Sequence, residues 1–334
     1  MNESVVKIGL LGASRIAVDA IIRRTADIDS VEVSRIAASS MDKARQYATE
    51  HEIPGIEDDY AALVTSDDVD LVYNALPPSG HMQWSIAALE AGKHVLCEKP
   101  FAMNAVQSRR MVDAAAATGR TLIEAFHYRF HPLFARVLEV LRSGQIGSIQ
   151  SLASHFTVPI PYRSGDFRHE VDVGGGALMD LGCYPVHWVR AVMGTEPAVL
   201  SASAVQESDG VDVAMTATLE FPGQVKAEVS CSMQADLRTG FDAELAVQGD
   251  RGTMTVINPL SPHSRHELIV EDGSGRTSET VDGNSTYFHQ LEHVVEVLRG
   301  DAKAITGGPD AIANMALIDA IYRAAGMLPR GMNA

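Results

Sequence analysis

The sequence predicts an α/β domain with a doubly wound parallel sheet, followed by an α+β domain with an open, mainly antiparallel sheet. Its 334 residues exceed the roughly 250 to 300 that one hydrophobic core usually serves, so two domains are expected. The first part alternates apolar runs of strand length with helical patterns, whereas beyond Gly147 one strand pattern follows another. We place the domains at residues 1–126 and 127–334, with the last helix packing back on the first domain as an open alternative.

Composition and charge exclude several classes of protein. The net charge of −16 leaves no basic surface for nucleic acid or for an anionic membrane. No apolar run reaches the roughly 18 residues that span a bilayer, and the amino terminus lacks the basic and apolar regions of a secretion signal. The three cysteines are far apart and odd in number, which indicates neither a disulfide framework nor a zinc site. We therefore expect a cytoplasmic protein.

A tight turn joins the first predicted strand to the first helix. Residues 5–11 form the apolar run of a buried strand, and Gly12 then opens a helix that extends to Ile22. Glycine lets the backbone approach a phosphate closely, and the amino terminus of the helix offers it unpaired N–H groups. Ser14 and Ala17 stand where the full dinucleotide fingerprint has its second and third glycines, so a plain β-α turn is the alternative. The candidate cofactor residues of this turn are Gly12, Ser14, Arg15 and Ile16.

The following segments repeat the alternation of strand and helix. We expect a sheet of six parallel strands, five of which can be placed in the sequence. In such sheets, ligands bind beyond the carboxyl ends of the strands. After the first strand, strands are predicted at 31–38, 69–76, 94–97 and 121–126, and helices at 42–50, 82–91 and 105–117.

The end of the second predicted strand bears on which dinucleotide binds. An Asp or Glu there would bind the ribose 2′-hydroxyl of NAD and repel a 2′-phosphate. This sequence instead has Ser39 and Ser40, with Lys43 one turn later, and hydroxyls beside a lysine suit an added phosphate. We therefore expect NADP in preference to NAD. In the alternative, Ser40 only caps the next helix.

Two more strand ends carry candidate residues. Residues 77–81 form a turn cluster after the third long strand, where His81 either caps a ribose or satisfies the turn. Lys99 follows Glu98 after the apolar run 95–97, and the proline after it favours an extended backbone. A charged residue at such an edge suits a ligand, and an ordinary loop charge is the alternative. The cofactor candidates at these two ends are Leu76, Pro77, His81, Glu98 and Lys99.

Residues 124–132 close the first domain with two histidines and an arginine. His127 and His131 are four residues apart, but Pro132 argues against a helical metal pair, so no metal is expected. Arg129 would meet a substrate hydroxyl or a phosphate, and an ion pair between the domains is the alternative.

The second domain is predicted as a series of strands. Apolar residues alternate with polar ones over 211–221 and 225–233, on either side of Pro222–Gly223, which predicts an antiparallel hairpin with one apolar face. Helices would cover that face, and the other would meet solvent or a second subunit, so we expect a homodimer or homotetramer formed through this sheet. Further strands are predicted at 242–248 and 253–257, with two more around 272–275, and the final helices at 287–298 and 310–325.

A polar loop and the helix after it are predicted to face the substrate. The loop at 166–176 is longer than a simple connection requires, and such loops are usually functional. The helix predicted at 177–193 is apolar except for one stripe, where Asp180, Tyr184 and His187 recur at helical spacing. A solvated face is the alternative, although solvated faces are normally rich in Lys and Glu. We therefore expect a site on this stripe.

Three motifs give the chain a family resemblance over nearly its whole length. They are the turn Gly12–Ala17, the segment Ala91–Pro100, which ends in Glu-Lys-Pro, and the segment Gly174–Pro185, which begins with three glycines. In these motifs the chain resembles the glucose-fructose oxidoreductase, inositol dehydrogenase and MocA family. The resemblance implies an NAD(P)-binding Rossmann domain, a second domain with a largely antiparallel sheet, and an active site between them.

The resemblance also implies roles for single residues. Lys99 matches the family lysine that hydrogen-bonds the reacting oxygen, and Glu98 matches the residue that tends to contact the cofactor ribose. Tyr184 stands where inositol dehydrogenases have histidine and where sugar 3-ketoreductases, xylose dehydrogenases and dihydrodiol dehydrogenases tend to have tyrosine. The residues expected to bind the substrate are Lys99, His127, Arg129, Tyr162, Arg168, Asp180 and Tyr184.

The activity implied is hydride transfer between nicotinamide and a hydroxyl or keto carbon of a sugar or sugar-like cyclic alcohol. A proton must join or leave the oxygen in the same event, and a lysine beside a phenol favours the phenolate. Lys99 and Tyr184 would therefore handle the proton, and Asp180 would orient the lysine or accept a substrate hydroxyl. The alternatives are an NAD-dependent glycosidase of the same fold, a trans-dihydrodiol dehydrogenase and a nicotinamide-sensing binding protein.

Overall fold

The chain folds into two compact units, each assembled from two separate stretches of sequence. The first unit comprises residues 1–127 and 287–312, and the second comprises residues 128–286 and 313–334. The computed structural model describes all residues except 1–4, 208–209, 235–239 and 333–334.

A parallel sheet of six strands, in the order β3-β2-β1-β4-β5-β6, forms the centre of the first unit. The order runs outward in both directions from β1 and β4, which confirms the predicted doubly wound arrangement. The sequence pattern does not single out β3, because two residues are too few to show a period. The strands are β1 (Val6–Leu11), β2 (Val31–Ala37), β3 (Gly55–Ile56), β4 (Leu71–Asn74), β5 (His94–Cys97) and β6 (Leu122–Glu124).

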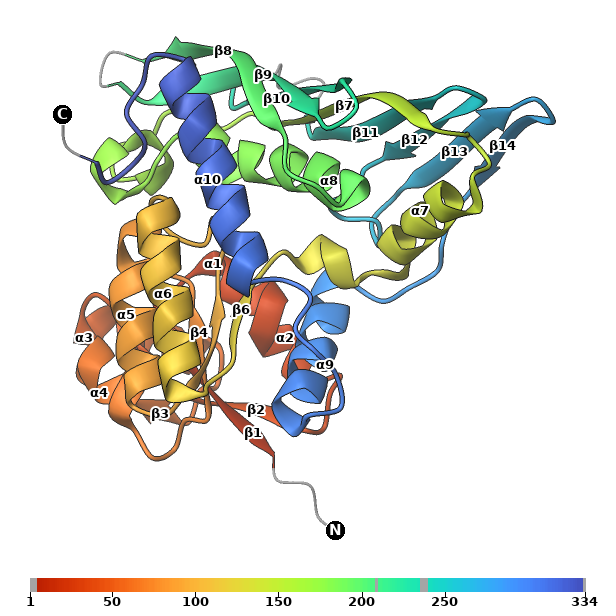
Figure 1. Cartoon of the computed structure of the whole chain (residues 1–334). Coiled ribbons are helices and arrows are strands. Elements are labelled where there is room, and N and C mark those ends of the chain that lie inside the picture. The colour runs from red at the N-terminus through yellow and green to blue at the C-terminus, as the bar shows by residue number, and fades with distance from the viewer. Residues whose placement is uncertain (1–4, 208–209, 235–239, 333–334) are drawn as a thin grey trace. The chain divides into compact units, whose positions relative to one another are not determined.

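Most helices of the first unit connect these strands, and α5 and α6 lie side by side (Figure 1). The turn predicted at 77–81 is wrong, because α5 begins at Pro78. Proline suits the first helical turn, where its missing N–H would be unpaired in any case. The helices are α1 (Arg15–Ala17), the π-helical turn η1 (Val18–Ile22), α2 (Arg23–Thr25), α3 (Met41–Glu50), α4 (Tyr60–Thr65), α5 (Pro78–Glu90), α6 (Ala105–Thr118) and α9 (Thr286–Arg299).

The central strands of this sheet are buried on both faces. Ile8, Leu10 and Leu11 of β1 and Tyr73 of β4 are completely shielded from solvent. Burying an aliphatic side chain of this size contributes roughly 1.5 to 3 kcal/mol. The strand ends are therefore held firmly enough to present side chains in fixed positions.

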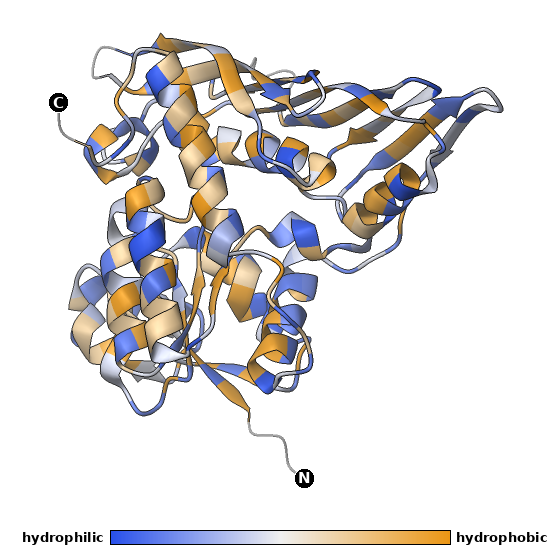
Figure 2. Cartoon of the chain, viewed as in Figure 1, coloured by the Kyte–Doolittle hydropathy of each residue, from blue (hydrophilic) through white to orange (hydrophobic). Residues whose placement is uncertain are grey.

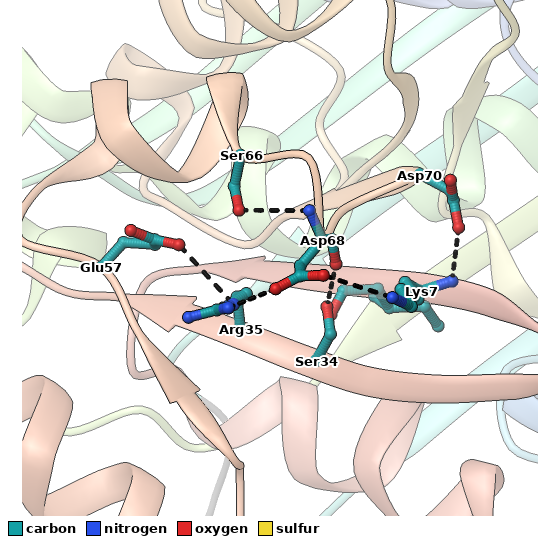
Figure 3. Close-up of polar contacts among 8 residues, drawn as sticks. Lys7, Ser34, Arg35, Glu57, Ser66, Asp68 and Asp70 are labelled. Atoms are coloured by element: carbon teal, nitrogen blue, oxygen red, sulfur yellow. Dashed lines mark hydrogen bonds and ion pairs between the residues drawn. The ribbon is translucent and has the colours of Figure 1, made fainter.

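A cluster of ion pairs joins the start of β1, the middle of β2 and the turn before β4 (Figure 3). Asp68 pairs with Lys7, whose Nζ lies 3.3 Å from Oδ1, and with Arg35. Arg35 also faces Glu57 across 3.7 Å, and the Ser34 hydroxyl donates to the Asp68 carbonyl oxygen. Because the side chains of Asp68 and Lys7 are 46% and 41% exposed, the cluster supports the sheet from its surface.

The second unit is built on an eight-stranded sheet in the order β14-β13-β12-β11-β7-β10-β9-β8. All neighbours are antiparallel except β7 and β10, which confirms the predicted, mainly antiparallel sheet. β8 was not predicted, since it has no fully buried face. The strands are β7 (Ile149–Thr157), β8 (Ala198–Gln206), β9 (Asp212–Phe221), β10 (Val225–Ser232), β11 (Asp242–Gly249), β12 (Gly252–Ile257), β13 (Glu267–Asp272) and β14 (Gly275–Glu279).

One face of this sheet is covered and the other is open. Helix α8 and the π-helical turn η5 pack on its central strands, and hydrophobic and hydrophilic residues alternate along the strands (Figures 1 and 2). The opposite face has a hollow of about 440 Å³, lined mainly by small and polar side chains, among them Ala153, Lys226 and Thr255. The helical elements are η2 (His127–Phe130), α7 (Pro132–Ser143), η3 (Phe167–His169), η4 (Val171–Val173), η5 (Leu178–Gly182), α8 (Cys183–Met193) and α10 (Gly308–Ala324).

Within the described residues, every helix is too short or too polar to cross a bilayer.

Candidate active site

The predicted cofactor turn follows β1 directly. Gly12 has a φ of +94°, and a Cβ at this position would lie 3.2 Å from the Leu76 side chain. The Ser14 hydroxyl accepts a hydrogen bond from the Ala17 N–H (3.3 Å) and so caps the helix. Tyr47 of α3 donates from its hydroxyl to the Ser14 carbonyl oxygen (2.8 Å), a contact that the sequence pattern does not reveal. The glycine, the exposed helix start and the tied-down backbone fit the phosphate cradle of a dinucleotide.

The end of β2 leads into α3 through the two serines. Ser40 accepts from the Lys43 N–H (3.3 Å), so it does cap the helix, as the alternative interpretation held. The Lys43 ammonium also donates to the Ser39 hydroxyl (3.1 Å). A hydroxyl, an ammonium and a helix amino terminus thus meet on an exposed edge, and this donor set fits a phosphate group.

His81 lies in α5, with its ring completely buried. Nδ1 lies 3.0 Å from the Pro100 carbonyl oxygen and Nε2 lies 2.7 Å from that of Leu76. Burial lowers the pKa of His81 to about 4, so the ring is neutral at pH 7 and its one N–H donates to one of the two carbonyls. Both ring nitrogens thus face the backbone of this unit, which favours the alternative in which His81 satisfies local structure and does not cap a ribose.

Glu98 and Lys99 follow β5 at the carboxyl edge of the sheet. The Glu98 N–H donates to the Asn74 carbonyl oxygen (2.9 Å), which extends the pairing of β5 with β4 by one residue. The Glu98 carboxylate is buried and accepts from the Tyr73 hydroxyl (2.5 Å) and the Lys99 N–H (3.2 Å). Tyr73 was not predicted as a site residue, because it looks like an ordinary strand aromatic. Its hydroxyl fixes the carboxylate beside Lys99.

Asn74, at the end of β4, is a second residue that sequence reasoning missed. Its amide donates to the His81 carbonyl oxygen (3.2 Å) and to the Ser85 hydroxyl (3.1 Å), and its oxygen accepts from the Leu76 N–H (3.4 Å). A fully buried asparagine with three such partners pins the start of α5 to the sheet. A polar residue closing an apolar strand is the signal that identifies it in the sequence.

The other residues predicted to bind substrate are spread over both units. His127 is buried in the first unit and stacks on Tyr287 of α9, with ring centroids 4.3 Å apart. Burial, with smaller contributions from Glu98 and Asp19, raises the pKa of Tyr287. In the second unit, the Arg129 guanidinium lies 4.5 Å from the centroid of the Phe134 ring.

The polar stripe of the second unit is buried. Asp180, Tyr184 and His187 are 8%, 4% and 1% exposed, so the alternative of a solvated face is wrong. The predicted continuous α-helix is also wrong at its start, because Asp180 lies in the π-helical turn η5. π-Helical turns are rare and often occur at functional sites. Aromatic rings of Tyr128, Phe156 and Trp188 surround Tyr184 at centroid distances of 5.9–6.3 Å.

The polar loop contributes an arginine to the same stripe. Arg168 donates from Nε to Oδ2 of Asp180 (2.7 Å) and contacts Asp166 through Nη1 (3.3 Å). Burial acts to lower the pKa of Arg168, but the two carboxylates raise it overall. Tyr162, in contrast, is exposed to solvent over 63% of its surface. Its ring lies edge-on to the ring of His169. The structure thus joins two predicted substrate residues, Arg168 and Asp180, in one ion pair.

Among the residues described, no group of histidines, cysteines or carboxylates has the arrangement of a metal site.

Known proteins match most of the chain. The model of an oxidoreductase family with an NAD-binding Rossmann fold matches residues 6–126, and that of the GFO/IDH/MocA C-terminal domain matches residues 134–255. The NADP-dependent D-xylose 1-dehydrogenase 2 of Haloferax volcanii is 32% identical, over 95% of this chain and 96% of that protein. The trans-1,2-dihydrobenzene-1,2-diol dehydrogenase of Xenopus laevis is 30% identical, over 82% and 86%.

A solved structure gives the same result. The 3-ketoreductase from Actinomadura kijaniata, in complex with NADP and TDP-benzene, has a TM-score of 0.88 at 26% identity, over 96% of this chain and 98% of that one. The match therefore extends over both sheets and not only over the dinucleotide-binding one. The protein belongs to the GFO/IDH/MocA family of oxidoreductases, whose NAD(P)-binding domain is the Rossmann fold seen in the first unit.

Proposed function

We propose that this protein is an NADP-dependent oxidoreductase acting on a hydroxyl or keto carbon of a sugar or a sugar-like cyclic alcohol. The observation that carries the proposal is the buried stripe of the second unit, where Arg168 and Asp180 form an ion pair one turn from Tyr184. Charged and hydroxyl groups at a shielded site suit a substrate that is covered with hydroxyls. The sugar-acting relatives support the same class.

The roles of the chain's own residues follow from their chemistry. Bound nicotinamide supplies or accepts the hydride. We assign Lys99 to the oxygen of the reacting carbon and Tyr184 to the proton that joins or leaves it. Asp180, whose carboxylate is engaged by Arg168, is assigned to a substrate hydroxyl, and Arg168 holds the carboxylate in place. The remaining assignments to the substrate are His127, Arg129 and Tyr162.

The cofactor preference rests on the edge formed by Ser39, Ser40 and Lys43. Their hydroxyls and ammonium fit a 2′-phosphate, and NADP is the cofactor named for two of the relatives. We expect Ser39→Asp to weaken NADP binding at least about tenfold, through repulsion of the phosphate, and to strengthen NAD binding. Titration of both cofactors by fluorescence measures this. Equal affinities of the unmodified protein for NAD and NADP would contradict the preference.

Substrate screening tests the function itself. Aldoses, keto-sugars and cyclic diols are incubated with NADP and NAD, in both oxidised and reduced forms, and the absorbance of reduced nicotinamide is followed. Stoichiometric change with an aldose or keto-sugar is the expected result. Cleavage of a glycoside without net change in free cofactor would instead identify the glycosidase alternative.

A second candidate activity is oxidation of a trans-dihydrodiol. The relative from Xenopus laevis favours it, and its substrate is also a cyclic diol. The same screen separates the two, because turnover confined to trans-dihydrodiols among the cyclic diols would replace the sugar assignment.

The second sheet and the cysteines bear on the oligomeric state and the cellular compartment of the protein. We assign a homodimer or homotetramer formed through the open face of the second sheet, because that face is broad and hollowed. We assign the protein to the cytoplasm because its three cysteines are all buried and form no disulfide, as is usual in a reducing compartment.

A further inference from the structure

A buried ion pair lies behind the polar stripe of the second unit. Asp212, the first residue of β9, is 0% exposed, and Arg330, in the segment after α10, is 3% exposed. Neither residue belongs to the three motifs of the family resemblance, and neither was a candidate site residue. Both are joined to the segment Gly175–Leu178, which leads into η5.

The hydrogen bonds of this pair converge on the start of the helix. Asp212 accepts from the Leu178 N–H at Oδ2 (2.7 Å) and from the Tyr322 hydroxyl at Oδ1 (2.9 Å), where Arg330 also pairs with it. Arg330 in turn donates from Nε to the Gly175 carbonyl oxygen (2.7 Å). The first N–H groups of a helix have no partner within it, and a carboxylate is favourable at that end. Asp212 therefore caps η5 and α8 from a distant strand.

The glycines allow this close approach. Gly176 has a φ of +132°, and a Cβ there would lie 2.1 Å from Oδ1 of Asp212. A Cβ on Gly175 would lie 2.5 Å from the Phe167 carbonyl oxygen, and the Gly176 N–H donates to the Arg168 carbonyl oxygen (2.9 Å). The backbone of the triple-glycine segment is thus held between the ion pair on one side and the loop that carries Arg168 on the other.

We infer that Asp212 and Arg330 are positioning residues, which hold the segment Gly175–Leu178 so that Arg168 and Asp180 meet in one fixed ion pair. Burying two charges costs free energy, and a well-packed apolar pair in their place would usually stabilise the fold to at least the same degree. Directed bonds to a carbonyl oxygen and an N–H fix the position of the backbone, which apolar contacts do not. The importance of the pair for turnover rests on the proposed function, whereas the positioning itself does not.

The test is hydrogen–deuterium exchange with mass spectrometry on Arg330→Met. We expect amide exchange in peptides spanning residues 166–182 to rise about tenfold or more, as the loss of a buried charged hydrogen bond allows. The matched control is Arg190→Met. Arg190 is also buried, pairs with Glu196 at 2.7 Å and bonds Asn314 of α10, but lies at the other end of α8. Its loss should leave exchange in 166–182 unchanged.

A second variant covers the case in which Arg330→Met does not fold. Arg330→Lys keeps the buried positive charge but loses the forked guanidinium group, which reaches both Asp212 and Gly175. Faster exchange confined to 166–182 supports the inference, and exchange in that region equal to that of the unmodified protein overturns it.

Turnover then separates this inference from the proposed function. With a sugar found in the screen, Arg330→Met should lower kcat/KM about a hundredfold with an unchanged Kd for NADP, and Arg330→Lys should recover part of the loss. Full kcat/KM in Arg330→Met, despite a loosened loop, would overturn the link to catalysis. If the unmodified protein turns over no sugar, the proposed function fails, and the exchange experiment still decides the positioning role.

Discussion

At the scale of single residues, Lys99 and Tyr184 have different surroundings. Lys99 follows a buried glutamate that Tyr73 holds in place, whereas Tyr184 is enclosed by aromatic rings on a helix that begins with a π-helical turn. Rigid surroundings of this kind fix a proton-transferring group in place, which is what acid–base catalysis requires. Substitutions that remove the Lys99 ammonium or the Tyr184 hydroxyl therefore test the two residues one at a time.

We expect Lys99→Ala and Tyr184→Phe each to lower kcat about a hundredfold or more, because each removes a group assigned to the reacting oxygen or its proton. The measurement is steady-state turnover of the sugar identified by screening, with cofactor binding titrated in parallel. Binding should survive in Tyr184→Phe, since Tyr184 has no assigned contact with the cofactor. Near-normal turnover in either variant would remove that residue from the mechanism.

At the scale of elements, the turn between β1 and α1 depends on Gly12. Its positive φ costs an alanine about 1 to 2 kcal/mol, and the new methyl group would also press on Leu76. We expect Gly12→Ala to lower the thermal midpoint and to weaken dinucleotide binding about tenfold. Gly119→Ala is the matched control, because Gly119 caps α6 with a φ of +66° and open space around it. The control should lose stability and keep full affinity. Equal affinity losses in the two variants would point to a general effect of strain.

The ion-pair cluster at Asp68 makes a prediction about pH. The hydrogen bond from Arg35, with smaller contributions from Lys7, lowers the pKa of Asp68 below its ordinary 3.8. The stabilisation is therefore present above pH 3.8 and is lost as the pH falls through the lowered pKa. We expect Asp68→Asn to be less stable than the unmodified protein at pH 7, with the difference vanishing in strong acid.

Urea midpoints measured across this pH range test the prediction. Asp67→Asn, one residue earlier, is the control. A difference between Asp68→Asn and the unmodified protein that persists undiminished in strong acid would show that the carboxylate charge is not the cause.

At the scale of the whole molecule, the open face of the second sheet makes a prediction about assembly. Ala153 of β7 and Ala246 of β11 are paired at the centre of this face, where small side chains line the hollow. We expect a dimer or tetramer by light scattering, and we expect Ala153→Arg to dissociate it, because the added charge would have to be buried without a partner. The unit itself should stay folded, since Ala153 is exposed. A monomer at working concentration would contradict the assembly.

The sequence predicts the parts of the fold that have a strong period. The hairpin of β9 and β10 is an example, because Val213, Met215 and Leu219 are buried at every second position. β3, α4 and β8 are missed: the first two are too short, and the third has no buried stripe, so distant contacts decide their structure. Helix α7 is missed as well, although its buried residues recur at helical spacing.

The same distinction holds for the candidate site. Gly12, Lys99 and Asp180 stand out by type and position in the sequence. Tyr73 does not, because its importance arises only when the strand ends come together, and Asn74 is marked only as a polar residue that closes an apolar strand. The α-helix predicted over 177–193 is wrong at its start, because a π-helical turn there leaves no mark in the residue pattern.

The division of each unit between two stretches of sequence has a consequence for biosynthesis. Residues 1–127 leave the ribosome well before residues 287–312, which complete the same unit, and all eight strands of the other sheet emerge in between. The first unit therefore stays incomplete until residues 287–312 have been made. Contacts between residues so far apart in sequence slow folding, so the nascent chain exposes an unfinished surface to chaperones until those residues emerge.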